Sequence, residues 1–343
     1  MNLVRSVWSR FDRFLAAILL TVAFAAVMPA RGEAAQALGW LTDVAIALLF
    51  FMHGAKLSPQ DALVGARHWR LHTVVFLSTF ALFPVLGIAA RFLFPDLLPE
   101  PLWAGVILLT ALPSTVQASI AFTSVAGGNV PAALCSASAS NILGVFLTPV
   151  LAGFLLTRHG LDISARSLLP IVLQLLLPFV AGQLSRPWIG RYLTRYPRAL
   201  RSVDYGSIML LVYSAFSHGV VAGIWHQIGA ADLLKVALVD VTLLAAVMVI
   251  LTFASRQLGF SRADEITIVF CGSKKSLVSG LPIAMLLFAG HVGLVVLPLM
   301  VFHQIQLMVC ASLARRYAAR RVTAGEGAPS IAFSPTCPQE AAD

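Results

Sequence analysis

Charged residues are scarce in this sequence: they make up 11% of its 343 residues, whereas hydrophobic residues make up 59%. A soluble globular protein of this length needs more polar side chains than that to cover its surface. The scarcity of charge therefore excludes a soluble domain. Together with a mean hydropathy of +0.87, it predicts an all-α polytopic membrane protein that is surrounded by membrane lipids.

Cysteine is also scarce, and its spacing matches no binding motif. Cys135, Cys271, Cys310 and Cys337 form no C-x-x-C pair and have no metal-ligand spacing. We therefore expect no disulfide, no zinc site and no cofactor. The 24 lysines and arginines outnumber the acids, but they fall between apolar runs rather than along one face. Nucleic acid is therefore not an expected partner, and the sequence gives no indication of an oligomeric state.

The chain contains many long apolar runs. A helix needs about 20 predominantly apolar residues to cross a bilayer. We predict ten membrane-spanning helices, near residues 14–30, 38–53, 71–94, 102–122, 131–156, 168–189, 204–226, 233–254, 266–289 and 292–313. With the N-terminus inside, most of the lysines and arginines fall on the cytoplasmic side. The positive-inside rule then predicts that both termini are cytoplasmic, in a bacterial inner membrane.

The longest cytoplasmic link, residues 186–201, divides the predicted spans into five and five. An odd number of spans in each half places the halves in opposite orientation, which predicts an inverted repeat. A shift of 162 residues pairs Pro113 with Lys275, Ser114 with Ser276 and Asn141 with His303. The predicted organisation is a cytoplasmic segment (1–13), a first five-helix repeat (14–156), an outer loop (157–167), a second five-helix repeat (168–313) and a disordered cytoplasmic tail (314–343).

Two adjacent lysines, Lys274 and Lys275, lie within the ninth apolar run. A lysine near the middle of a bilayer costs roughly 2.5 to 3.5 kcal/mol, so two lysines there require shelter by protein or water. We predict that the ninth helix is broken at this point, that at least one ammonium group lies at the break, and that Ser273 and Ser276 beside it are candidate binding residues. In the alternative interpretation the ninth helix begins later, and both lysines extend to the cytoplasmic surface.

The fourth run contains the segment Leu112-Pro-Ser-Thr-Val-Gln-Ala-Ser119. Its proline removes one backbone hydrogen bond, and nearby hydroxyl and amide groups can replace it. A broken helix with polar residues at the break is typical of substrate or ion sites in secondary transporters. The candidate binding residues here are Ser114, Thr115, Gln117 and Ser119. The simpler alternative is a proline kink whose serines bond to carbonyls of their own helix.

The fifth and tenth runs also carry polar side chains. Ser136 and Ser140 share one face of the fifth helix and Asn141 follows them, while His303, Gln304 and Gln306 lie within the tenth. Polar groups in a span usually face the bundle interior, and we take all of these except Gln306 as candidate binding residues. Tight helix packing, or a hydrogen bond between helices, explains them equally well.

Two acidic residues lie within predicted spans, Asp43 in the second and Asp240 in the eighth. Ionisable residues in a membrane usually pair with one another or with backbone carbonyls. Asp43 and Asp240 are therefore candidate partners for the lysines, and Asp240 is a candidate supporting residue of the site.

Four segments carry a family resemblance: Phe50-Phe-Met-His-Gly-Ala-Lys-Leu-Ser58, residues 112–130, Leu147-Thr-Pro149, and Cys271-Gly-Ser-Lys-Lys-Ser-Leu-Val-Ser-Gly-Leu-Pro282. In these segments the chain resembles the bile acid:sodium symporter family, and in particular its SBF-like branch, over roughly residues 10–315. The resemblance implies a panel domain and a core domain, broken helices four and nine that cross near the midplane, and alternating access. The sodium sites of the family would map to Gln117, Ser119, the stretch 136–141 and Ser273, with Thr79 as a further polar ligand.

The chain departs from this family at one informative position. Sodium-coupled members carry a carboxylate at the position of Ser273, whereas this chain has none there and continues with two lysines. A neighbouring ammonium group disfavours a bound sodium ion. The hypothesis is that a lysine supplies part of the positive charge that sodium supplies elsewhere. Because a buried lysine can also lose its proton, coupling to protons is a further hypothesis.

These observations together predict a secondary active transporter for a small organic anion, working by alternating access and coupled to Na⁺ or H⁺. An ion channel or uniporter that uses the same helix crossing is the alternative, and it would never concentrate its solute. A membrane enzyme is less favoured, since the spans contain no His-Asp pair, metal-ligand spacing or nucleophile motif.

Overall fold

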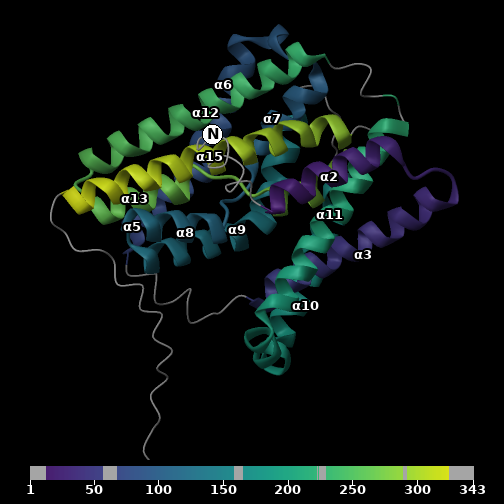
Figure 1. Ribbon diagram of the computed structural model, residues 1–343, viewed down its shortest axis with the longest axis horizontal. Coiled ribbons are helices and arrows are strands. Elements are labelled where there is room, and N and C mark those ends of the chain that lie inside the picture. The colour runs from purple at the N-terminus through teal and green to yellow at the C-terminus, as the bar shows by residue number, and fades with distance from the viewer. Residues whose placement is uncertain are drawn as a thin grey trace, which may run out of the picture.

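The computed structural model describes residues 13–56, 68–157, 165–221, 223, 229–288 and 292–323. All regular structure in these residues is helical (Figure 1), so the predicted all-α class is confirmed. By length and composition, five of the described helices can cross a membrane: Glu33–Ala55, Trp69–Leu93, Val130–Leu156, Ala230–Gln257 and Val292–Arg320.

The helical elements follow the predicted apolar runs. In the first half they are α2 (Arg13–Val27), α3 (Glu33–Lys56), α5 (Trp69–Leu77), the π-helix η2 (Ser78–Leu82), α6 (Phe83–Leu93), the short 3-10 helix η3 (Pro95–Leu97), α7 (Glu100–Ala111), α8 (Gln117–Ala126) and α9 (Val130–Thr157). In the second half they are α10 (Ala165–Arg195), α11 (Pro197–Val221), α12 (Ala230–Gln257), α13 (Arg262–Gly272), α14 (Leu277–Leu287) and α15 (Val292–Thr323). The runs near 102–122 and 266–289 are each divided between two helices, at the predicted places.

The largest differences from the prediction lie at two boundaries. The predicted link at 186–201 is largely helical, because α10 continues to Arg195 and α11 already begins at Pro197. Proline has a fixed φ and no N–H, and it therefore suits the first position of a new helix. At the other end, α15 continues to Thr323, past the predicted start of the tail at residue 314. Its residues Ala314 and Tyr317 are buried, so packing extends the helix, and residues 324–343 lie outside the described chain.

The π-helix η2 lies directly before Phe83 and Pro84 and leaves one carbonyl open. In a regular α-helix the N–H of Phe83 would donate to the carbonyl of Thr79, but here it donates to the carbonyl of Ser78. The next residue, Pro84, has no N–H to offer to Thr79 in its place. The carbonyl oxygen of Thr79 is therefore left without a donor from its own helix.

The described helices form two groups. In the first, α3 lies along α10, and α11 packs against α2 and α3. Figure 1 shows α3 and α10 together at the lower right, away from α5, α8 and α13. In the second group α7 packs against α6, α9, α14 and α15, and its residues from Leu102 to Ala111 are all buried. A helix that is buried on every face is the centre of its group.

Two glycines allow the close crossing of α3 and α10. A Cβ atom at Gly54 would collide with the carbonyl oxygen of Phe179, and a Cβ atom at Gly182 would collide with that of Phe51. The two backbones are therefore in direct contact, as small residues permit at membrane helix interfaces. This crossing fixes the wall of the first group that faces the second.

Candidate functional site

The breaks in the two divided helices meet inside the second group. The N–H of Ser276 donates to the carbonyl oxygen of Pro113 at 2.8 Å. The hydroxyl of Ser114 donates to the carbonyl oxygen of Cys271, the penultimate residue of α13, at 2.6 Å. Each broken helix thus satisfies main-chain groups that the other leaves open, as a backbone shielded from water requires.

The first break, residues 112–116, is held in place by α9. Pro113 has no N–H, and the N–H of Ser114 donates to the hydroxyl of Ser140 at 3.0 Å. The carbonyl of Ser114 accepts a hydrogen bond from the Asn141 amide at 2.8 Å. Ser140 and Asn141 therefore fix the backbone of Ser114 from both sides.

The second break, residues 273–276, is held by α15 in the same manner. The N–H of Lys275 donates to Oε1 of Gln306, and the carbonyl of Lys275 accepts from Nε2 of the same side chain, both at 2.9 Å. Lys275 and Ser114 therefore occupy equivalent places in the two breaks.

Main-chain oxygens enclose the ammonium group of Lys275. Its Nζ donates to the carbonyl oxygens of Thr79 at 2.7 Å, Thr110 at 2.7 Å and Leu112 at 2.8 Å. The centroid of the Phe83 ring lies 4.3 Å from Nζ. Only 1% of this residue is exposed, and the three charge-assisted hydrogen bonds and the ring offset the cost of removing the charge from water.

Lys274 is equally buried but has fewer polar contacts. Its Nζ donates to the carbonyl oxygen of Ala118 at 2.8 Å and lies 4.1 Å from the centroid of Phe122 and 5.3 Å from that of Phe270. Both lysines are therefore enclosed at the break. The alternative in which both extend to the cytoplasmic surface is wrong.

Neither candidate carboxylate pairs with a lysine in the described chain. Asp43 is exposed on α3. Asp240 is fully buried on α12, and neither of its carboxyl oxygens has a hydrogen-bond partner among the described residues. Carbonyl dipoles take the place of the expected carboxylate. Every residue carries a carbonyl, so residue identity gave no sign of this arrangement.

Replacing Asp240 with leucine is expected to raise thermal stability. A buried polar group without a partner costs about 1 to 3 kcal/mol, and leucine has a similar branched shape without polar atoms. The midpoint of thermal unfolding in detergent should rise above that of the wild type. Asp232→Leu is the matched control, because Asp232 accepts hydrogen bonds from Gly229 and Lys235 and its loss should not stabilise. A lower midpoint for Asp240→Leu would show that the buried carboxyl group of Asp240 stabilises the fold.

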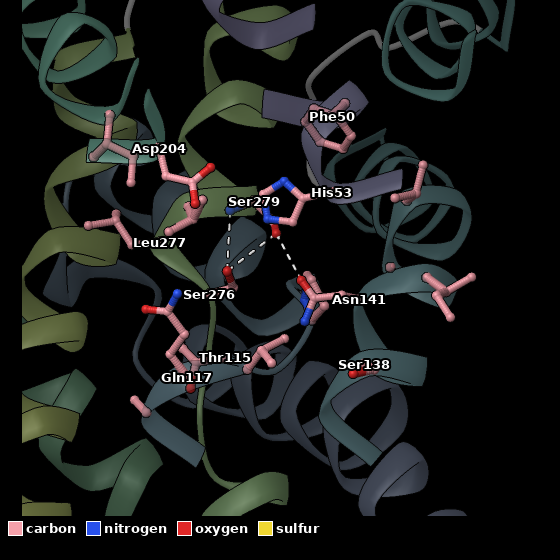
Figure 2. Close-up of a pocket in the computed structure, with 18 of the residues that line it drawn as sticks. Phe50, His53, Thr115, Gln117, Ser138, Asn141, Asp204, Ser276, Leu277 and Ser279 are labelled. Carbon is pink, nitrogen blue, oxygen red and sulfur yellow. Dashed lines mark hydrogen bonds between the residues drawn. The ribbon is translucent and has the colours of Figure 1, made fainter. Parts of the chain in front are cut away.

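A cavity of about 410 Å³ lies between the two helix groups (Figure 2). The wall from the first group carries Phe50 and His53 of α3, Phe179 of α10 and Asp204 of α11. The opposite wall comes from both breaks and from α8, α9, α14 and α15. Figure 2 shows polar side chains from both walls, His53 and Asp204 on one side and those of α8, α9 and α14 on the other.

Two helices begin at this cavity. Gln117, the first residue of α8, and Leu277, the first residue of α14, both line it. The N-terminal N–H groups and the positive ends of two helix dipoles are therefore directed toward the cavity. Ser276 caps α14 by accepting the N–H of Ser279 at 3.3 Å, and the Ser279 hydroxyl donates to Asn141 at 3.3 Å (Figure 2).

The structure divides the candidate residues into sets. Those that line the cavity are Thr115, Gln117, Asn141, Ser276 and His303. Those that are buried at the breaks behind it are Ser114, Ser119, Ser140, Ser273, Lys274 and Lys275.

Three candidates differ from this pattern. The Ser136 hydroxyl pairs with His72 of α5 at 2.6 Å. Thr79 contributes its carbonyl rather than its hydroxyl, which donates to Val75. Gln304 is half-buried on α15 but is brought neither to the cavity nor to the breaks.

Gln306, noted in the sequence as a polar group of the tenth run, holds the backbone of Lys275. Three polar residues that line the cavity, His53, Asp204 and Ser279, were not among the candidates. A polar side chain within an apolar run was a usable signal for His53. Asp204 carried no such signal, because it lies where a cytoplasmic helix end was expected. Only the position of α11 brings it to the cavity.

Comparison with known proteins places this arrangement in a class of membrane transporters. The model of the SBF-like CPA transporter family matches residues 12–319, and the chain belongs to that family. The chain is thus an integral membrane transport protein and not an enzyme, as the sequence predicted.

Individual relatives agree with this assignment. "Putative symporter YfeH" of Escherichia coli K12 is 53% identical over 307 residues, covering 89% of this chain and 92% of the relative. "Uncharacterized protein PA2026" of Pseudomonas aeruginosa is 51% identical over 327 residues, covering 95% and 97%. "Sodium/bile acid cotransporter 7" of Mus musculus is 26% identical over 313 residues, covering 88% and 91%. The predicted resemblance to the bile acid:sodium symporters is confirmed.

Proposed function

We propose that this protein carries a small organic anion across the bacterial inner membrane by alternating access, with the cavity between the two helix groups as its substrate site. The observation that carries the proposal is that α8 and α14 both begin at the cavity. Helix N-termini offer unpaired N–H groups and positive partial charge, and anions are favoured there. The names of the relatives, a symporter and a sodium/bile acid cotransporter, support transport of a solute of this class.

The arrangement of the two walls supports alternating access. The group that contains α3, α10 and α11 supplies one wall, and the group that contains the two broken helices supplies the other. Movement of one group against the other would open the cavity first to one side of the membrane and then to the other. We identify the first group with the panel domain and the second with the core domain.

We propose the same ten spans and cytoplasmic termini as the sequence analysis, arranged as two inverted five-helix repeats. The equivalent roles of Ser114 and Lys275 support the repeats. Each lies in a break, and in each case the helix that follows the broken pair bonds both its N–H and its carbonyl. In one break Ser140 and Asn141 bond the N–H and the carbonyl of a residue, and in the other Gln306 alone makes both bonds. An inverted repeat explains why these different side chains hold equivalent backbone groups.

Of the two coupling ions, sodium is less favoured than the proton. Lys274 and Lys275 place two ammonium groups at the meeting point of the breaks, and like charges repel strongly where water is excluded. None of the described acidic residues hydrogen-bonds or pairs with them there to offset this repulsion.

Counterflow in proteoliposomes tests the function. The purified protein is reconstituted with an unlabelled anion inside, and uptake of the labelled anion is followed for a bile acid, aliphatic mono- and dicarboxylates and sulfate esters. Gradients of sodium and of pH are imposed separately. We expect counterflow for one class of anion, and accumulation that does not require sodium. No counterflow for any anion would reject the proposal, and flux that never concentrates solute would favour a channel or uniporter.

Filling the cavity is expected to abolish this transport. Ser138 of α9 lines the cavity, and Ser138→Phe would place a ring in it without changing the breaks. The matched control is Ser312→Phe, because Ser312 is exposed on α15 and its hydrogen bonds, with Met308 and Arg315, lie within that helix. We expect counterflow to fall at least about tenfold in the first variant and to persist in the second, with equal yields of folded protein. Equal transport by both variants would place the substrate site elsewhere.

A further inference from the structure

The carbonyl oxygens around Lys275 form a site that the rest of the chain builds without the lysine. Thr79 belongs to η2, Thr110 to the last turn of α7 and Leu112 to the first break. None of them is near Lys275 in sequence. The ammonium group of Lys275 therefore fills a position that three other segments define, and it is held there by its own side chain.

Each of these oxygens lacks its usual helical donor for a separate reason. Thr79 lacks one because Phe83 donates to Ser78 and Pro84 has no N–H. The oxygen of Thr110 would be paired with the N–H of Ser114 in a continuous helix. That N–H donates to the Ser140 hydroxyl at 3.0 Å instead.

Leu112 completes the set. It lies outside the helix, with φ −71° and ψ 152°, so its carbonyl turns away from the axis of α7 and has no place in an α-helical ladder. The π-helix and the proline break thus expose three oxygens at 2.7 to 2.8 Å from a common point, above the face of the Phe83 ring.

This set of groups is suited to a small cation. Rings of backbone carbonyls replace the water shell of monovalent cations in channel filters, and an aromatic face attracts a cation. Three acceptors match the three N–H groups of a primary ammonium ion. No carboxylate among the described residues bonds to Lys275, so the charge is balanced by dipoles alone.

We propose that Thr79, Thr110, Leu112 and Phe83 form a monovalent-cation site for a primary ammonium group, which the chain keeps filled with its own Lys275. The role of Lys275 is that of a positioning residue, since it ties η2, α7 and the two breaks together. The inference rests on the proposed transport function. It adds that the core of the transporter needs no dissolved cation to keep its geometry, because the ammonium group of Lys275 is covalently attached and cannot leave.

Emptying the site and refilling it from solution tests the proposal. Lys275→Ala removes the side chain beyond Cβ, and n-propylammonium replaces those atoms one for one. The variant is purified in detergent, and its thermal unfolding midpoint is measured with increasing n-propylammonium chloride, choline chloride keeping the ionic strength constant. We expect a midpoint well below that of the wild type, recovered for the most part and in a saturable manner by the amine.

Three controls separate this site from general effects. Tetramethylammonium has the charge but no N–H group, and n-propanol has the chain but no charge; neither should restore the midpoint. The wild type and Lys274→Ala should not respond to the amine, because Lys275 fills the site in both. Equal recovery by tetramethylammonium, or equal responses of Lys275→Ala and Lys274→Ala, would overturn the proposal.

Extraction provides a second measurement in case Lys275→Ala does not survive purification. Membranes that contain the variant are solubilised with and without n-propylammonium, and the monodisperse fraction is measured by size-exclusion chromatography. A larger fraction in the amine supports the site, and the same degree of aggregation with and without it rejects the site. Neither measurement uses a transported anion, so failure here leaves the counterflow result unaffected, and failure of counterflow leaves this result unaffected.

Discussion

Lys275→Leu is expected to yield little or no folded protein. The substitution removes three charge-assisted hydrogen bonds and leaves the carbonyl oxygens of Thr79, Thr110 and Leu112 buried without a donor. Each unsatisfied group costs about 1 to 3 kcal/mol, and folded proteins have only about 5 to 15 kcal/mol of total stability. The yield of monodisperse protein after extraction, and the unfolding midpoint of any that remains, measure the effect.

Lys274→Leu is the matched comparison, since the two lysines are adjacent and equally buried. Its ammonium group makes one hydrogen bond, to a carbonyl that lies within α8 and also belongs to that helix's own ladder. The rings of Phe122 and Phe270 beside it are apolar surfaces against which leucine can pack. We expect a folded protein with a midpoint near that of the wild type. Equal losses of folded protein in Lys275→Leu and Lys274→Leu would show that the three carbonyl contacts of Lys275 do not set its contribution to stability apart from that of Lys274.

Substituting the glycines where α3 crosses α10 should have an effect of similar size. A valine at Gly54 or Gly182 would place its Cβ against a carbonyl oxygen of the opposite helix, so the two backbones must move apart. Overpacking of a buried contact typically costs 1 to 3 kcal/mol even where side chains can adjust. Here the obstacle is backbone, so we expect a larger loss. Counterflow and the unfolding midpoint should both fall sharply.

Gly39 provides the control for this prediction. It lies on α3 as well, but a Cβ atom there would meet nothing within 4 Å. Gly39→Ala should leave the midpoint unchanged or raise it, because alanine favours a helix over glycine by up to about 1 kcal/mol. If Gly54→Val and Gly182→Val behave like Gly39→Ala, the close backbone contact between α3 and α10 is not part of the native structure.

The two breaks were predictable because they have local causes. Pro113 cannot continue the hydrogen-bond ladder of α7, and two consecutive lysines cannot remain in hydrocarbon. Both features are visible in the residue types alone, as are the long apolar runs. The matching roles of Ser114 and Lys275 were not predictable in this way, because they rest on backbone hydrogen bonds rather than on similar side chains.

The partner of the lysines was not predictable in the same way. Asp240 was the evident candidate, since opposite charges attract, yet it lies on α12 without contact to either ammonium group. The true partners are carbonyl oxygens, and whether a carbonyl is available depends on which helical bonds are missing. The places of Asp204 and His53 in the cavity wall were not predictable for a similar reason. Their helices, α11 and α3, belong to the opposite group, and only the packing of the two groups brings these side chains to the cavity.

The sequence by itself determined that this chain lies in a membrane as helices, that two of them are broken, and that lysines stand at one break. It did so because the cost of placing charge or an unpaired backbone group in lipid depends on residue type and spacing. Only the tertiary structure decided what surrounds the lysines and where the cavity lies. Both depend on the meeting of segments that are far apart in the chain. Pro84 and Pro113 each leave a carbonyl without its helical donor, and Gln306 bonds both the N–H and the carbonyl of Lys275.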